Sequence, residues 1–197
     1  MTTFAIIIAV ILIFVVIILL TRRSGPYIPE ERIAGMKGEM IADSIISQVL
    51  DKDDLLFTNV EITYDGKDTE LDNVVVNKNG VFIIEVKNFS GILRGSEDDN
   101  EWIKYHTTEA GNTYTKTVRN PIKQVNRQIY ILSRYLNSFG CRTWVEGYVF
   151  LVNGNSPFES DILLENKSDI DRAIHNPGRA PLSVRSISEI SELLVKQ

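Results

Sequence analysis

Cysteine, histidine and surplus basic charge are all scarce in this chain of 197 residues. The single cysteine, Cys141, excludes an internal disulfide framework and fits a reducing compartment. The two histidines, His106 and His175, lie far apart in sequence without a partner at ligand spacing, which argues against a zinc site. Lysine and arginine number 21 against 26 aspartates and glutamates, a net charge of −5. Any nucleic-acid site must therefore be a local basic patch.

Charge is also missing from residues 4–20, which form an unbroken apolar run. A helix of about 20 residues spans roughly 30 Å, the thickness of one hydrocarbon core. No basic residue precedes the run and no small-residue cleavage site follows it, so a cleaved signal peptide fits poorly. Arg22 and Arg23 come next, and the positive-inside rule places them and the following chain in the cytoplasm. We expect a transmembrane anchor at residues 1–21 in the cell membrane, with a linker at 22–30.

The rest of the chain mixes helical and strand patterns. Residues 30–50 predict a helix whose apolar stripe comprises Ile33, Met36, Met40, Ile41, Ile45 and Val49. Strand patterns follow at 55–63, 70–77 and 81–88, the last two joined by the hairpin signal NKNG, and shorter ones at 102–107 and 113–118. This order predicts an α/β fold, a mixed sheet flanked by helices.

A second helix begins with a clear capping signal. Asn120 is a favoured N-cap residue, Pro121 is favoured at the first helical position, and Gly140 ends the helix. Its apolar stripe comprises Ile122, Val125, Ile129, Leu132 and Leu136. We expect this helix to cross over from the hairpin to a strand at 144–154, and we expect one or two short helices in the tail.

The hairpin places charges where a buried strand would not be expected to carry them. Glu85 and Lys87 share one face of the strand GVFIIEVK, because side chains alternate along a strand. Antiparallel pairing through the turn at 77–80 puts Asp72 roughly across from Glu85 or its neighbours. Two neighbouring carboxylates repel each other unless a cation lies between them. An unpaired buried charge is costly, so these residues need either structural partners or a function.

Two interpretations of this cluster remain open from spacing alone. Asp72 and Glu85 would hold Mg²⁺, which prefers oxygen ligands, while Lys87 orients or activates a water that attacks a phosphodiester. Alternatively, Lys87 forms an ion pair with one of the acids that caps the end of the strand. Acid–x–Lys spacing is common in both situations, and the residues themselves favour the two equally.

Several segments resemble a known family when taken together. GMKGE, TELDNVVV, GVFIIEVKNFSG and NPIKQ occur in this order, with Trp102 between the last two. This set is similar to the NERD (nuclease-related) domain, a branch of the restriction-endonuclease-like superfamily with an Asp…(Asp/Glu)-x-Lys motif. The resemblance covers roughly residues 35–150. It implies a restriction-endonuclease-like core at residues 31–155, followed by a helical extension at 156–197 that packs on it.

The resemblance also implies roles for individual residues. Asp72 and Glu85 are the implied metal ligands, for Mg²⁺ or alternatively Mn²⁺, and Lys87 is the implied catalytic lysine. Glu39 in KGE would be an additional acid near the metal, and Gln124 in NPIKQ a polar residue that reaches the site from the second helix. Without the resemblance, Glu39 and Gln124 are indistinguishable from ordinary solvent-facing helix residues.

One local basic feature stands out against the acidic total. Lys123, Arg127 and Arg134 fall on one face of the second helix, and Arg119 lies just before it. Such a stripe would track a phosphate backbone, with DNA preferred to RNA as the partner. A solvated face of an amphipathic helix explains the same pattern.

Two functions are therefore expected. The first is a membrane-anchored, cytoplasm-facing, metal-dependent nuclease, motivated by the complete set of acids, lysine and glutamine. The second is a non-catalytic module that binds nucleic acid or protein at the membrane, motivated by the acidic net charge and by the tether formed by residues 4–20.

Overall fold

The computed structural model describes residues 14, 29–108, 111–176 and 181–195. The expected anchor at 1–21 and linker at 22–30 lie almost entirely outside these ranges. Within them, no helix has the length and apolar character needed to cross a bilayer. The chain divides into two compact units, residues 1–33 and 34–197, and the fold described below is that of the second.

A five-stranded mixed sheet forms the centre of the fold. Its strands lie in the order β1-β2-β3-β7-β8, with bounds β1 (Leu55–Tyr64), β2 (Lys67–Asn77), β3 (Gly80–Lys87), β7 (Val145–Leu151) and β8 (Leu163–Leu164). The first three strands run antiparallel, whereas β7 pairs parallel to β3 and β8 parallel to β7. Asp65 and Gly66, both at positive φ, form the two-residue turn between β1 and β2. The mixed α/β fold expected from the sequence is confirmed.

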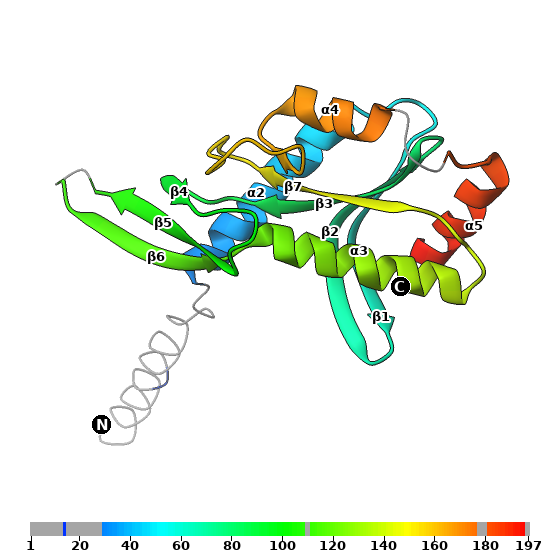
Figure 1. Cartoon of the computed structure of the whole chain (residues 1–197), viewed down its shortest axis with the longest axis horizontal. Helices are drawn as coiled ribbons and strands as arrows, with labels where there is room; N and C mark the ends of the chain where they lie inside the picture. Colours follow the sequence, from blue (N-terminus) through cyan, green and yellow to red (C-terminus); the bar gives the residue numbers. More distant parts are fainter. Residues whose placement is uncertain (1–13, 15–28, 109–110, 177–180, 196–197) are drawn as a thin grey trace, which may run out of the picture. The chain divides into compact units, whose positions relative to one another are not determined.

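Helices cover both faces of this sheet (Figure 1). α3 (Pro121–Ser138) and α5 (Val184–Val195) contribute to one apolar cluster, through residues such as Ile131, Leu132 and Leu194. α2 (Glu30–Ser47) and α4 (Lys167–His175) contribute to a second cluster, through residues such as Ile46 and Ile174. The alternating strand β3 supplies both clusters, which is why its apolar run has no polar interruption before Glu85.

The crossover helix forms as its sequence predicts. The Asn120 side chain accepts a hydrogen bond from the Ile122 amide at 2.9 Å, and Pro121 occupies the first turn. The same Asn120 side chain donates to three carbonyl groups in the loop of residues 95–100, which ties the start of α3 to that loop. α3 connects the β3 side of the sheet to β7, which pairs parallel to β3.

A separate three-stranded sheet is inserted between β3 and α3. It comprises β4 (Ile92–Arg94), β5 (Glu101–Thr107) and β6 (Thr113–Arg119), in that order. Trp102 anchors it: the indole is fully buried in the first cluster, and its Nε1 donates to the Ser96 carbonyl at 2.9 Å. The sequence predicted β5 and β6, but the short strands β4 and β8 were missed because two or three residues carry no readable alternation.

The buried face of α2 differs from the expected stripe. Ile33, Met36 and Met40 are 53%, 52% and 72% exposed. Small residues are buried instead: a Cβ added at Gly38 would lie 2.6 Å from the Asn88 Cβ, and Ala42 is fully buried. Because α2 packs close to the sheet at this point, only small side chains fit between them. A search for large apolar residues therefore assigns the wrong residues to the buried face of this part of α2.

Candidate active site

The two acids of the hairpin meet where β2 and β3 separate. The last paired residues are Asn73 and Ile84, so Asp72 lies directly across from Glu85. Beyond this pair the Asp72 side chain replaces the backbone as acceptor, and its Oδ2 receives a hydrogen bond of 2.7 Å from the Val86 amide. The carboxylate is thereby fixed at the edge of the ladder, next to Glu85.

Glu85 is buried, with a side chain only 1% exposed. Lys87 Nζ lies 2.5 Å from Oε1, and Gln124 Nε2 donates to the same oxygen at 2.6 Å. Gln128 Nε2 donates to Oε2 at 2.6 Å. Three donors, one of them charged, thus compensate the burial of this carboxylate. They come from β3 itself and from successive turns of α3.

Gln128 is a member of the site that the sequence analysis missed. It is 1% exposed, and its Nε2 also donates to the Glu70 carbonyl at 3.0 Å. Its Oε1 is buried without a hydrogen-bond partner among the described residues. The available signal was its spacing: it follows Gln124 by one helical turn, so both amides project from one face of α3.

Asp72 has an abnormal proton affinity. Burial, and next to it repulsion by Glu85, raise the pKa of its carboxyl from 3.8 to about 7. The hydrogen bond from Val86 and the charge of Lys87 oppose that shift, whereas Glu39 adds to it. Near neutral pH this carboxyl is therefore poised between its two protonation states, and a nearby cation would favour the ionised one.

Glu39 approaches the acid pair from the helix layer on the face of the sheet opposite to α3. It lies on α2 one residue after Gly38, which touches Asn88 just past the end of β3. The Asn88 amide also donates to the Ala34 carbonyl at 2.8 Å, fixing α2 against this end of the sheet. The structure thus brings together all five residues that the resemblance implied: Glu39, Asp72, Glu85, Lys87 and Gln124. Among them Asp72, Glu85 and Glu39 offer the oxygen ligands that a hard divalent ion takes.

The basic residues predicted to contact nucleic acid are all exposed, but their surroundings differ: these are Arg119, Lys123, Arg127 and Arg134. Arg127 donates to the Asp68 carbonyl at 3.1 Å, and the Arg134 guanidinium lies 5.5 Å from the centre of the Tyr130 ring. Arg119 ends β6 just before the N-cap of α3, and Lys123 lies in the first turn of α3, next to Gln124 in sequence. The first turn of α3 contains no acidic residue. The partial positive charge of the helix N-terminus therefore adds to the positive charges of Arg119 and Lys123.

Comparisons with known proteins agree with this arrangement. Residues 34–152 match the family described as the nuclease-related domain, NERD. The Bacillus anthracis protein pXO1-01, described as uncharacterized, is 33% identical over 69 residues, covering 34% of this chain and 32% of that protein. The chain therefore aligns with about a third of that curated relative's length. No solved structure matches the chain.

Proposed function

The chain belongs to the nuclease-related domain (NERD) family, and from this premise we propose that it is a metal-dependent nuclease that hydrolyses phosphodiester bonds in nucleic acid. One observation carries the proposal: an acid pair formed by the partly buried Asp72 and the buried Glu85, with Lys87 in contact with Glu85. A strand end of purely structural purpose has no need of two adjacent carboxylates, one of which has its pKa raised to about 7. The mixed sheet and flanking helices support a restriction-endonuclease-like fold.

The residues fit a magnesium ion by their chemistry. Asp72, Glu85 and Glu39 provide carboxylate oxygens from three elements, and Gln128 Oε1 adds a buried acceptor without a donor. Three carboxylates and one unpaired buried amide oxygen on neighbouring residues would favour a cation and its waters. A bound Mg²⁺ supplies stabilisation of charge on the phosphate and lowers the pKa of water. Mn²⁺ is the alternative ion.

Each polar residue then has a defined role. Lys87, 23% exposed, is placed to donate to the phosphate or to orient the attacking water from the strand end. Gln124 and Gln128 hold the two oxygens of Glu85 in fixed positions, which keeps this carboxylate aligned. Glu39 adds negative charge beside Asp72. A cation in the site would compensate that repulsion.

The nucleic-acid backbone would enter over the start of α3. Arg119 and Lys123 supply positive charge there, and β5 and β6 place Lys104 opposite Lys116 across the inserted sheet. These two lysines would add to the local positive charge that a phosphate backbone contacts. DNA rather than RNA is the proposed partner. The domain is proposed to face the cytoplasm, tethered by residues 4–20.

A second candidate function is favoured by the contacts of Glu85. Lys87, Gln124 and Gln128 already satisfy both of its oxygens. A buried carboxylate whose two oxygens are satisfied in this way is stable in a fold without any metal. On this alternative the chain is a non-catalytic module that binds nucleic acid or protein at the membrane.

Cleavage assays with the full chain separate the two functions. Single- and double-stranded DNA and RNA are incubated with Mg²⁺, with Mn²⁺ and with EDTA. The nuclease proposal expects cleavage that requires the metal and falls at least about 100-fold in Glu85→Gln. Glu61→Gln, which changes an exposed strand glutamate, serves as the matched control. Nucleic-acid binding without cleavage under any metal condition would favour the second function.

A further inference from the structure

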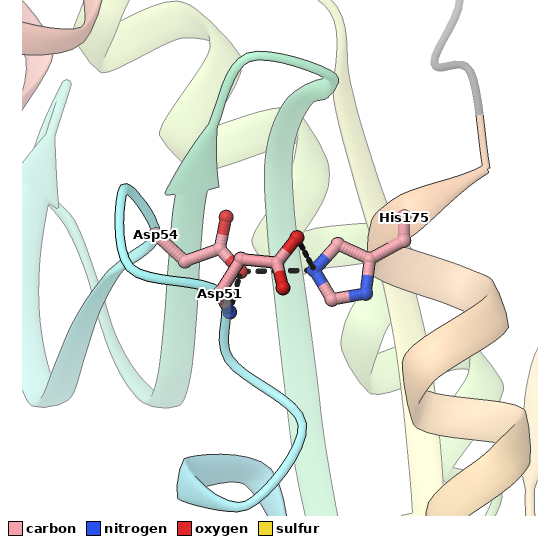
Figure 2. A group of neighbouring side chains, drawn as sticks. All are labelled: Asp51, Asp54 and His175. Carbon is pink, nitrogen blue, oxygen red and sulfur yellow. Dashed lines mark hydrogen bonds and ion pairs between the residues drawn. The ribbon is translucent and has the colours of Figure 1, made fainter.

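A second group of ligand-type side chains gathers far from the candidate active site. His175 ends α4, and Asp51 and Asp54 lie on the loop before β1; Figure 2 shows both aspartates turned toward the imidazole ring. His175 Nε2 lies 2.9 Å from Asp54 Oδ2 and 3.8 Å from Asp51 Oδ2. One ligand atom from each residue lies within 4.8 Å of the others. With metal–ligand bonds of about 2.0–2.1 Å, tetrahedral ligands stand roughly 3.3 Å apart, within the range of these separations.

The imidazole is held in the orientation that metal ligation requires. Its Nδ1 lies 2.8 Å from Asp171 Oδ1, one helical turn earlier on α4, which directs Nε2 toward the two aspartates. Histidine ligands of metals usually interact with a carboxylate or carbonyl through the second ring nitrogen in this way. Asp54 is equally constrained: it is 6% exposed and accepts a 2.7 Å hydrogen bond from the Asp51 amide.

The charge of the group points to a cation. Three carboxylates, those of Asp51, Asp54 and Asp171, surround one imidazole. None of the ion pairs found among the described residues joins any of these acids to a lysine or arginine. Even a charged His175 would leave an excess of negative charge at this position, which a divalent ion would neutralise.

We propose that Asp51, Asp54 and His175 bind a divalent transition-metal ion of the Zn²⁺ class. One imidazole nitrogen and two carboxylate oxygens form a borderline donor set, which suits Zn²⁺ better than Mg²⁺. Three protein ligands leave a fourth tetrahedral position for water. Asp171 is a positioning residue that orients the histidine.

The site joins parts of the chain that are distant in sequence. His175 and Asp54 are separated by 121 residues, and the neighbouring Ile174 carbonyl accepts hydrogen bonds from Asn77 and Asn79 in the β2–β3 turn. Asn77 lies five residues from Asp72, roughly 16 Å along β2. The ion would therefore fasten α4 to the hairpin end of the sheet, independently of the nuclease chemistry. The sequence argument against zinc considered only local spacing, so it did not weigh a group assembled from the loop before β1 and the end of α4.

Metal titration of the full chain tests the proposal. The protein is stripped with EDTA, exchanged into chelator-free buffer at neutral pH, and titrated with Zn²⁺ by calorimetry and with Co²⁺ by visible absorption. All variants carry Asp72→Asn, so that the candidate active site contributes little. We expect one saturable Zn²⁺ site, visible absorption bands on Co²⁺ binding, and a rise in unfolding temperature with Zn²⁺ but not with Mg²⁺.

Four substitutions and two controls locate the ion. His175→Gln and Asp54→Asn should each weaken Zn²⁺ binding by more than about 10-fold, and Asp171→Asn by a smaller factor with altered Co²⁺ bands. Asp51→Asn keeps the proposal testable if the buried positions fail to fold, because the Asp51 side chain is 75% exposed and its loss leaves the core intact. Asp53→Asn and His106→Gln, at exposed residues outside the group, should leave binding unchanged.

The contrary results are equally definite. Failure of the Asp72→Asn chain to bind Zn²⁺ saturably would overturn the proposal. So would Zn²⁺ affinity that is equal with and without Asp51→Asn and His175→Gln. Either result would leave His175 as a charged bridge between the aspartates, with no role in metal binding.

Discussion

Glu85 is the residue on which the candidate site depends. A carboxylate that is 1% exposed persists in a strand only when donors satisfy it, and here one lysine and two glutamines do so. The same contacts fix its position beside Asp72. The same three donors therefore allow Glu85 to be buried and keep its carboxylate aligned with Asp72. Substituting each donor separately shows whether this alignment is needed for cleavage or only for folding.

Lys87→Met removes the ammonium and keeps an unbranched side chain. If Lys87 acts on the phosphate or water, cleavage should fall by about 100-fold or more. Stability should fall by only about 1–3 kcal/mol, the range for a hydrogen bond to a charged group, because two amides still donate to Glu85. Urea unfolding without metal and cleavage rates with Mg²⁺ measure the two effects.

An exposed lysine provides the control for that change. Lys78→Met, in the β2–β3 turn, should alter neither cleavage nor stability. A large stability loss in Lys87→Met, with cleavage by the folded protein unchanged, would assign Lys87 to the fold and contradict the catalytic role.

Asp72 predicts a pH dependence of stability in the absence of metal. Because the pKa of its carboxyl in the folded state is raised to about 7, folding favours the protonated form. The contribution of this group to stability is therefore present at pH 4 and lost as pH rises through 7. Asp72→Asn removes that loss. In EDTA the variant should therefore have a higher free energy of unfolding than the wild type at pH 8, and the two values should approach each other at pH 5. One pKa unit corresponds to about 1.4 kcal/mol, and allowing for partial exposure the gain is on the order of 2 kcal/mol.

Thermal unfolding at the two pH values, with and without Mg²⁺, measures this difference. Mg²⁺ should stabilise the wild type more than Asp72→Asn, because the ion favours the ionised carboxylate. If Asp72→Asn changes the stability by the same amount at pH 5 and at pH 8, the Asp72 carboxyl does not have the raised pKa. Equal stabilisation of both proteins by Mg²⁺ would exclude Asp72 as a ligand.

At the scale of elements, α2 places Glu39 by means of a glycine. A Cβ at Gly38 would meet the Asn88 Cβ at 2.6 Å, whereas a Cβ at Gly35 has nothing within 4 Å. Gly38→Ala should therefore force α2 away from the end of β3, with an overpacking cost of about 1–3 kcal/mol. It should also reduce cleavage, since Glu39 shifts with the helix.

Gly35→Ala is a matched control on the same helix. Alanine is favoured over glycine in a helix interior by about 1 kcal/mol, so this variant should be more stable and equally active. Urea unfolding and cleavage rates compare the pair. Equal effects of the two substitutions would contradict the close approach of α2 to Asn88.

The elements also show what the sequence could and could not predict. α3 was predictable because Asn120, Pro121 and a regular apolar stripe all indicate the same helix, and the hairpin register followed from its turn. The first half of the stripe predicted on α2 was wrong, because packing there depends on Gly38 and Ala42 rather than on Met36 and Met40. Farther along, Ile45 and Val49 pack in the second cluster as predicted.

Polar groups were harder to predict than elements. Gln128 had no motif to mark it, and its importance comes from a contact with a strand 43 residues away. Asp51, Asp54 and His175 are joined only after β1, β2 and α4 have packed together. Local pattern predicts elements well, whereas contacts across the fold follow from tertiary packing.

The whole molecule combines an acidic total with local basic surfaces. Its net charge of −5 disfavours nonspecific attraction to nucleic acid, so binding would depend on short-range contacts near Arg119 and Lys123. Such binding is strongly salt-dependent, because each neutralised phosphate releases counterions. A tether to the membrane would further restrict which nucleic acids the domain meets.

The proposed membrane tether gives the last prediction. Residues 4–20 contain no charged or polar side chain, and Arg22 and Arg23 follow immediately. Because cationic flanks stay on the cytoplasmic side, the N-terminus should face outward and residue 197 inward. A reporter active only in the cytoplasm should work when fused after Gln197, and a reporter active only after export should not. Changing both arginines to glutamate should weaken this preference, while Lys78→Glu, far from the run, should not. Activity of the exported reporter in the wild-type fusion would show that the proposed orientation is wrong.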